Sequence, residues 1–147
     1  DDILDLALVS IEDYRLNKLS TNSPDEFKLI LEGFMIRGLS NFENCIKDLS
    51  DRDDDTHQFN VVLDDLEKSI IADWTVIMWL DKEINDTRQI TSMLQNRNEA
   101  HRYSEANNLK AKADHRVQMV EDVKHKQTTY SLKHADWKGW ASGNYQL

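Results

Sequence analysis

The chain has 147 residues, which is the size of one domain and long enough to bury about two-thirds of the surface that its unfolded form exposes. It contains only four glycines and one proline, so the tight turns of β-sandwiches and barrels are disfavoured. Its 27 acidic and 18 basic side chains give a formal net charge of −9, which repels phosphate backbones and disfavours general nucleic-acid binding. The composition therefore predicts an all-α protein.

The single cysteine, Cys45, excludes a disulfide within the chain. Because it stands among the apolar residues Phe42, Ile46 and Leu49, we expect a small core residue rather than a reactive thiol. The first ten residues, DDILDLALVS, lack the positively charged region of a signal peptide. The longest apolar run, WTVIMWL, is too short to span a bilayer. We therefore expect a protein made in the cytoplasm and without a membrane partner.

Two amphipathic helices are predicted in the first third of the chain. Apolar residues recur at steps of three and four from Ile3 onwards, which predicts a helix over about residues 3–18. A second helix is expected to begin at Ser23, where SPDE offers a capping serine, a proline suited to the first helical position and a glutamate for a capping box. Its apolar face continues to Leu49, so the helix is expected to end near residues 49–51.

Two glycines interrupt this second predicted helix. Gly33 and Gly38 each cost about 1 kcal/mol relative to alanine in a helix interior. They therefore indicate either the close approach of a neighbouring helix or a bend.

An acidic loop and a β-like run follow. Three aspartates alternate as the first three ligands of a calcium loop do: Asp51, Asp53 and Asp55. The position that needs glycine holds Thr56, however, and the one that needs a bidentate glutamate holds Val62. A solvated acidic loop is therefore favoured over a calcium site. The run QFNVV, residues 58–62, is expected to form a short strand or extended arm.

The third predicted helix, about residues 63–85, has apolar residues on nearly every side, which is typical of a central helix. Asp73 lies within this apolar pattern, and a buried, unpaired carboxylate is costly. It is expected either to pair with an arginine or lie at an exposed edge, or to contact another subunit. No partner at helical spacing supports a catalytic role.

Residues 86–102 show a weaker pattern, and a final long helix is expected to begin at Ser104 as its N-cap. Tyr103 is expected to pack back on the first turn of that helix. Basic residues concentrate in this last third of the chain, and they are expected to form a solvated face or to pair with acidic neighbours.

The last fourteen residues, HADWKGWASGNYQL, show no helical period and carry three large aromatic residues: Trp137, Trp140 and Tyr145. So short a tail cannot bury its own rings, because ordering each residue costs about 1–2 kcal/mol of backbone entropy. The rings are expected either to fold back on the helical bundle or to dock on a neighbour, where aromatic anchors dominate interface energetics. The predicted organisation is a helical bundle over residues 1–133 and an extended docking tail over residues 134–147.

No motif for catalysis or cofactor binding is evident. The sequence has no glycine-rich phosphate loop, nucleophile elbow or Cys-His pairing near Cys45. The histidines are too scattered for one metal ion, since even His115 and His125 are three helical turns apart. We therefore expect no enzyme, no cofactor and no metal. The predicted fold is an all-α four-helix bundle with a short extended arm between its second and third helices.

The order of features from about Phe27 to Leu132 resembles the helical head-to-tail adaptor proteins of tailed bacteriophages. FENCIKDL, residues 42–49, is similar to the family's F-x-x-C-x-x-D-L segment. The run IIADWTVIMWLDKEIN is similar to its aromatic and aliphatic central helix, and YSEANNL, residues 103–109, to the opening of its last helix. The first helix, the acidic DRDDD loop and the tail have no counterpart in this pattern.

The resemblance implies a virion structural protein without catalytic activity, located at the head-tail interface. It would form a ring, commonly twelve-fold, beneath the portal protein and would contact the next neck or tail protein. Genomic DNA would pass through its channel without specific binding, because negative side chains do not make the counterion-releasing contacts that hold DNA. Trp137, Trp140 and Tyr145 would then dock on the portal.

Rings are built from head-to-tail contacts between unlike faces. The acidic loop and the basic last third of the chain are two such faces. We therefore expect the subunit interface to involve the following residues: Asp53, Asp54, Asp55, Asp73, Arg116 and Lys124. The alternative function is a small acidic regulatory or inhibitor protein that binds a basic partner or mimics DNA.

Overall fold

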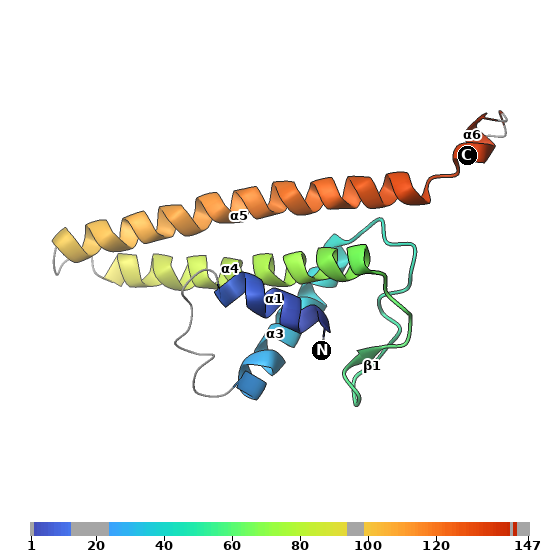
Figure 1. Cartoon of the computed structure of the whole chain (residues 1–147). Coiled ribbons are helices and arrows are strands. Elements are labelled where there is room, and N and C mark those ends of the chain that lie inside the picture. Colours follow the sequence, from blue (N-terminus) through green and yellow to red (C-terminus); the bar gives the residue numbers. More distant parts are fainter. Residues whose placement is uncertain (1, 13–23, 94–98, 142, 144–147) are drawn as a thin grey trace.

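The computed structural model describes residues 2–12, 24–93, 99–141 and 143, and it is mostly helical, as the composition predicts (Figure 1). The helices are α1 (Asp2–Glu12), α3 (Pro24–Gly38), α4 (Asp65–Met93), α5 (Glu99–His134) and α6 (Trp137–Ala141), with a 3-10 turn η1 (Leu39–Asn41). Two short strands, β1 (Arg52–Asp53) and β2 (Gln58–Phe59), lie between η1 and α4.

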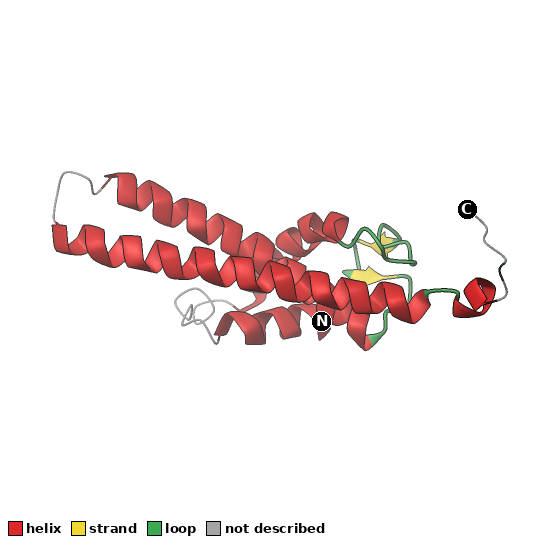
Figure 2. Cartoon of the chain, turned by 90° about the horizontal axis from the view of Figure 1, so that it is seen from above, coloured by secondary structure: helices red, strands yellow, loops and turns green. Residues whose placement is uncertain are grey.

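Helix α4 is the centre of the fold, because it packs on α1, α3 and α5. Helix α5 runs antiparallel along one side of α4, and α1 and α3 lie on the other side (Figure 1). The prediction of a central helix between 63 and 85 is therefore confirmed. Seen from above, α4 and α5 form one long hairpin, and α6 lies beyond the far end of α5 (Figure 2).

The core forms around α4 because its apolar residues recur around most of the helix. The buried side chains of α4 include Ile70, Ile71, Trp74, Ile77 and Leu80. From α5, only Val123 and Tyr130 are buried among the described residues. Each fully buried side chain of this size contributes about 1.5–3 kcal/mol. The core therefore lies between α4 and the α1–α3 layer more than along α5.

The second predicted helix is shorter than expected. Helix α3 ends at Gly38, and residues 42–50 form a loop rather than a continuation to residues 49–51. A Cβ at Gly38 would lie 3.1 Å from the Trp74 Cβ, so the chain passes α4 closely and then turns. Beyond this point the side chain of Asn44 bonds to the Gln127 carbonyl of α5 at 2.8 Å. This bond attaches the loop 42–50 to α5.

Helix α5 begins five residues before the predicted cap, at Glu99. Ser104 is therefore inside the helix, and the prediction that it caps the helix is wrong. Tyr103 is 74% exposed and does not pack on a first turn. Residues 86–93 continue α4, so the weak pattern there belongs to one long helix. A serine fits the start of a helix in sequence, but the packing of α5 on α4 extends the helix past this local signal.

The run QFNVV pairs within the chain. Strand β2 is antiparallel to β1, with Arg52 opposite Phe59 and Asp53 opposite Gln58. The turn between them is closed by Asp53, whose Oδ1 accepts the backbone N–H groups of Asp55 and Thr56 at 2.9 and 3.1 Å. The predicted arm is therefore part of a small hairpin.

The remaining boundaries fall partly outside the described residues. Helix α1 agrees with the predicted first helix up to Glu12, and residues 13–18 lie beyond the description. The same is true of Ser23, the predicted cap of α3. In the tail, Trp137–Ala141 form the short helix α6 where an extended segment was expected.

Candidate functional site

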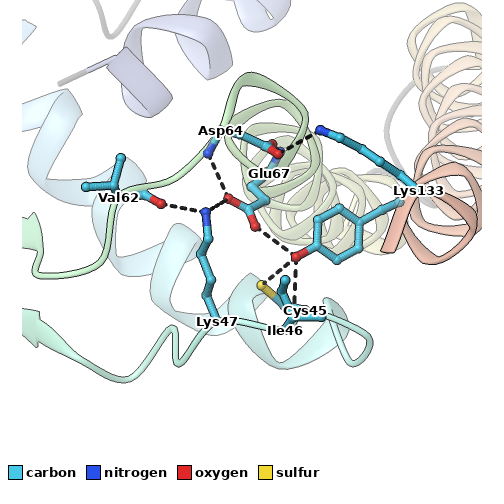
Figure 3. A network of polar contacts seen from close by, with 8 residues as sticks. Cys45, Ile46, Lys47, Val62, Asp64, Glu67 and Lys133 are labelled. Carbon is cyan, nitrogen blue, oxygen red and sulfur yellow. Dashed lines mark hydrogen bonds and ion pairs between the residues drawn. The ribbon is translucent and has the colours of Figure 1, made fainter. Parts of the chain in front are cut away.

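A network of charged and polar side chains joins the loop 42–50 to the start of α4 and the end of α5 (Figure 3). We call it the Glu67 network, and its members are Lys47, Asp64, Glu67, Tyr130 and Lys133. The Glu67 side chain is fully buried. Its Oε2 accepts hydrogen bonds from Lys47 Nζ at 2.6 Å and from the Asp64 backbone N–H at 2.7 Å. Its Oε1 accepts one from the Tyr130 hydroxyl at 2.8 Å.

Local sequence places Glu67 in this position. Helix α4 begins at Asp65, so Asp64 is the N-cap and Glu67 the third helical residue. Asp64 Oδ1 accepts the Glu67 backbone N–H at 2.8 Å, and Glu67 accepts the Asp64 N–H in return. This reciprocal pair is a capping box. The sequence interpretation missed it, although DDLE before an apolar run carries the signal.

The network fixes the protonation of its members. Burial raises the pKa of Glu67, but hydrogen bonds from Lys47, the Asp64 backbone and Tyr130 outweigh it, and the net pKa is below the ordinary value. Burial raises the pKa of Tyr130 well above its ordinary value, and its hydrogen bond to Glu67 adds to the rise. Glu67 therefore stays ionised and Tyr130 stays a hydrogen-bond donor at neutral pH. The arrangement suits a fixed structural contact better than proton transfer.

Two carboxylates of this network and the neighbouring His134 are grouped closely enough to be considered as metal ligands. Ligand atoms of Asp64, Glu67 and His134 all lie within 4.8 Å of one another. The carboxylates are already engaged by cations, however, since Lys47 pairs with Glu67 and Lys133 pairs with Asp64 at 3.0 Å. A metal ion would have to displace both ammonium groups and the Tyr130 hydroxyl from Glu67. The donor set therefore fits ion pairs, and we assign no metal to it.

Ion pairs continue along the α4–α5 hairpin. Three further pairs join the two helices: Lys126 with Asp73 at 2.5 Å, Arg116 with Asp81, and Lys112 with Glu83 at 3.6 Å. Burial raises the pKa of Asp73, and the hydrogen bond and charge of Lys126 oppose that rise. Much of the basic charge of α5 is thus matched by acidic residues of α4.

The predicted interface residues are not gathered in one place within a chain. Asp73 and Arg116 have partners on the neighbouring helix of their own chain. Lys124 is exposed and lies on a surface groove of about 780 Å³ between η1, α4 and α5. The acidic hairpin residues make only local contacts among the described residues: Asp53 closes its turn, Asp54 pairs with Arg52 at 3.0 Å, and Asp55 is exposed.

Two of the three tail aromatics are placed by α6. Trp137 is 55% exposed and Trp140 is 67% exposed. The Trp137 indole N–H donates to the Leu132 carbonyl at 2.9 Å, and Asp136 Oδ1 accepts the Gly139 N–H at 2.9 Å. Both rings therefore present most of their apolar surface to solvent. Tyr145 lies outside the described residues.

Cys45 is half-buried, and its Sγ lies 3.9 Å from the Tyr130 hydroxyl. Beside the Glu67 network it packs against the core without being fully buried, so the expectation of a small core residue is met only in part.

Comparisons with known proteins identified no relative of this chain. No family model, curated protein or solved structure matches the chain. Among the described residues, no helix combines the length and the apolar character that crossing a bilayer requires.

Proposed function

We propose that this chain is a virion structural protein, a head-to-tail adaptor of a tailed bacteriophage, which forms a ring under the portal and continues the DNA channel. The observation that carries the proposal is the pair of exposed tryptophans on α6, beyond the end of α5 (Figure 1). The resemblance of FENCIKDL, the tryptophan-rich central helix and YSEANNL to the adaptor family supplies the identity of the partner.

The tail is suited to docking on the portal. A tryptophan side chain has about 150–250 Å² of surface, and about half of it is exposed here. Covering that half would contribute roughly 2–3 kcal/mol for each ring at about 25 cal/mol per Å². Trp137 and Trp140 are three residues apart on one helix, so both can enter the same partner surface. In this proposal Tyr145 extends the same docking segment.

The helical body is suited to a rigid ring subunit. In the proposal α1, α3, α4 and α5 act as one four-helix bundle, and the ion pairs between α4 and α5 stiffen its long hairpin. Neighbouring copies would meet through the acidic hairpin residues 53–55 and the exposed Lys124. Asp73 and Arg116 would contribute at the edge of that contact. The net charge of −9 would keep DNA from adhering to the channel, and the next neck or tail protein would bind below.

Binding to the portal protein tests the proposal. The double variant Trp137→Ala, Trp140→Ala should fold normally, because neither ring belongs to the core, and it should lose portal binding in mass photometry. Tyr103→Ala is the matched control, since Tyr103 is also an exposed aromatic residue of the described part of the chain but lies near the other end of α5. Undiminished portal binding by the double variant, with both proteins folded, would count against the docking role of the tail.

The acidic surface favours a second candidate, a small regulatory protein that binds a basic partner or mimics DNA. Asp54 and Asp55 are exposed on the hairpin, and the chain carries an excess of nine negative charges. Under this alternative the purified protein would form a 1:1 complex with a basic protein and would not bind the portal protein. Finding that the purified protein is a monomer does not distinguish the two candidate functions, because an adaptor can remain monomeric until it binds the portal.

A further inference from the structure

Helix α3 has two apolar faces, and α1 and α4 cover only one of them. Phe27, Leu31 and Phe34 are buried against the core. On the opposite side, Leu29 is 59% exposed and Ile36 is 38% exposed, and Ile30 beside them is 51% exposed. A helix with one solvated face normally places charged or polar residues there. The outer face of α3 therefore has the composition of a contact surface.

Gly33 lies in the middle of this outer face, one helical turn from both Leu29 and Ile36. Apart from Gly33, its two neighbours in the chain and the nearby backbone of α3, no heavy atom of the described residues lies within 4 Å of the position that its Cβ would occupy. Gly38 is different, because Trp74 of the same chain passes close to it. The close approach of α4 therefore accounts for Gly38, whereas nothing in the described chain accounts for a helix-weakening glycine at position 33.

The charges on α3 indicate what covers the face. Glu26 and Arg37 are eleven residues apart, which is close to three full turns, so they lie on the same side of Gly33, between it and Ile30 on the outer face. Both are exposed, and neither forms an ion pair with another described residue. When two such helices pack antiparallel, Glu26 of each copy lies beside Arg37 of the other. The face is therefore complementary in charge to itself.

We propose that the outer face of α3 binds the same face of a second copy of this chain, with the two helices antiparallel about a two-fold axis. Leu29 of each copy then packs over Gly33 of the other, where the missing side chain leaves room. Ile36 closes each end of the apolar contact, and the two Glu26–Arg37 pairs set the direction of packing. Isologous contacts of this kind place the same patch on both partners.

The contact is independent of the adaptor proposal and uses a different helix from the docking tail. One helix face is at the small end of protein interfaces, so the dimer should be weak and should form only as concentration rises. A closed ring uses head-to-tail contacts between neighbours, so the α3 dimer is a state of the free protein.

Sedimentation velocity over a range of micromolar concentrations tests the contact. The wild-type chain should show a reversible monomer–dimer equilibrium. Leu29→Gln should weaken it by about tenfold, because a buried apolar contact is lost. Val117→Gln is the matched control, since Val117 is equally exposed but lies on α5, and it should leave the equilibrium unchanged. A wild-type protein that stays monomeric throughout, or a Leu29→Gln variant that dimerises as well as Val117→Gln, would overturn the proposal.

Gly33→Gln separates the interface from folding. Glutamine is a better helix former than glycine, so the isolated monomer should unfold at a higher temperature. The added side chain should nevertheless weaken dimerisation by about tenfold, because it fills the space that Leu29 of the partner needs. A more stable monomer with unchanged dimerisation would exclude this face.

Exchange of charges tests the antiparallel direction. Glu26→Arg alone and Arg37→Glu alone each place two like-charged pairs in their own dimers, so each variant should be monomeric. Mixing the two variants gives a heterodimer in which both pairs are again opposite in sign, and association should return. If the mixture stays monomeric while wild type dimerises, the two faces do not meet in this way. If the protein binds the portal but never dimerises, the adaptor proposal is supported and the α3 dimer is excluded.

Discussion

At the scale of residues, the strongest feature is the buried carboxylate of Glu67, which accepts three hydrogen bonds, one of them from the charged Lys47 ammonium. It connects three segments that are far apart in the sequence: the loop containing Lys47, the start of α4 and Tyr130 near the end of α5. Breaking one bond to a buried charge costs more than an average hydrogen bond. Local substitutions in the network should therefore have measurable effects on the whole fold.

Tyr130→Phe removes one donor from Glu67 and keeps the ring that packs edge-on against Phe42 at a centroid distance of 5.1 Å. We expect the free energy of unfolding in urea to fall by about 1–3 kcal/mol. Tyr103→Phe is the control, because that hydroxyl lies on an exposed ring and its loss should change nothing. Equal stability of the two variants would contradict a structural role for the Tyr130 hydroxyl.

The pH dependence of stability should report Glu67. Its pKa is lower in the folded chain than in the unfolded chain, so its stabilising effect is present above the ordinary value of 4.5 and is lost as pH falls through the folded value. The stability difference between wild type and Glu67→Gln should therefore be largest near neutral pH and should shrink below about pH 4.5. A difference that stays constant across this acid range would show that the carboxylate charge contributes nothing.

At the scale of elements, sequence periodicity predicted which segments are helical but placed several boundaries wrongly. The pattern over 63–85 was strong because α4 buries residues on two sides. The pattern after Gly38 was equally regular, yet Phe42 and Leu49 reach the core from a loop. Periodicity alone cannot separate these cases, since the contacts that hold the loop, such as the bonds from Asn44 to α5, are tertiary. The capping box of α4 was readable, whereas the pairing of Lys47 and Tyr130 with Glu67 depends on tertiary folding.

Ser104 gives a direct test of where α5 begins. In the structure Ser104 is inside the helix, so Ser104→Ala should raise the free energy of unfolding by a few tenths of a kcal/mol through helix propensity. If Ser104 were the N-cap, the same change would lower stability by about 1 kcal/mol. Thermal and urea unfolding of the variant would give the sign.

The two glycines of α3 form a matched pair. Gly38→Ala should destabilise the chain by about 1–3 kcal/mol, because the new Cβ would lie 3.1 Å from the Trp74 Cβ and 3.2 Å from its backbone. Gly33→Ala should stabilise the monomer by about 0.5–1 kcal/mol, since the site is open. Dilute samples should be used so that only the monomer is observed. The reverse order of the two effects would contradict the placement of α3 on α4.

At the scale of the whole molecule, the chain joins a helical body to an exposed aromatic end. The sequence predicted the helical class and drew attention to Trp137 and Trp140, since two tryptophans in a short polar tail are conspicuous. It could not predict that α6 is helical, and it left open whether the basic residues of α5 pair with acidic neighbours. Lys112, Arg116 and Lys126 do pair with α4, which depends on the packing of distant segments. The identity of the partner depends on short motifs whose order resembles the adaptor family.

The adaptor proposal is decided by the mass of the complex that forms when this protein is mixed with portal rings of the bacteriophage to which the proposal assigns it. The adaptor account predicts a discrete gain of whole copies of the 17.2-kDa chain, commonly twelve for each portal ring, seen by mass photometry. It also predicts that the gain disappears for the double variant Trp137→Ala, Trp140→Ala. Portal rings whose mass stays unchanged at saturating concentrations of folded wild-type protein would contradict the account.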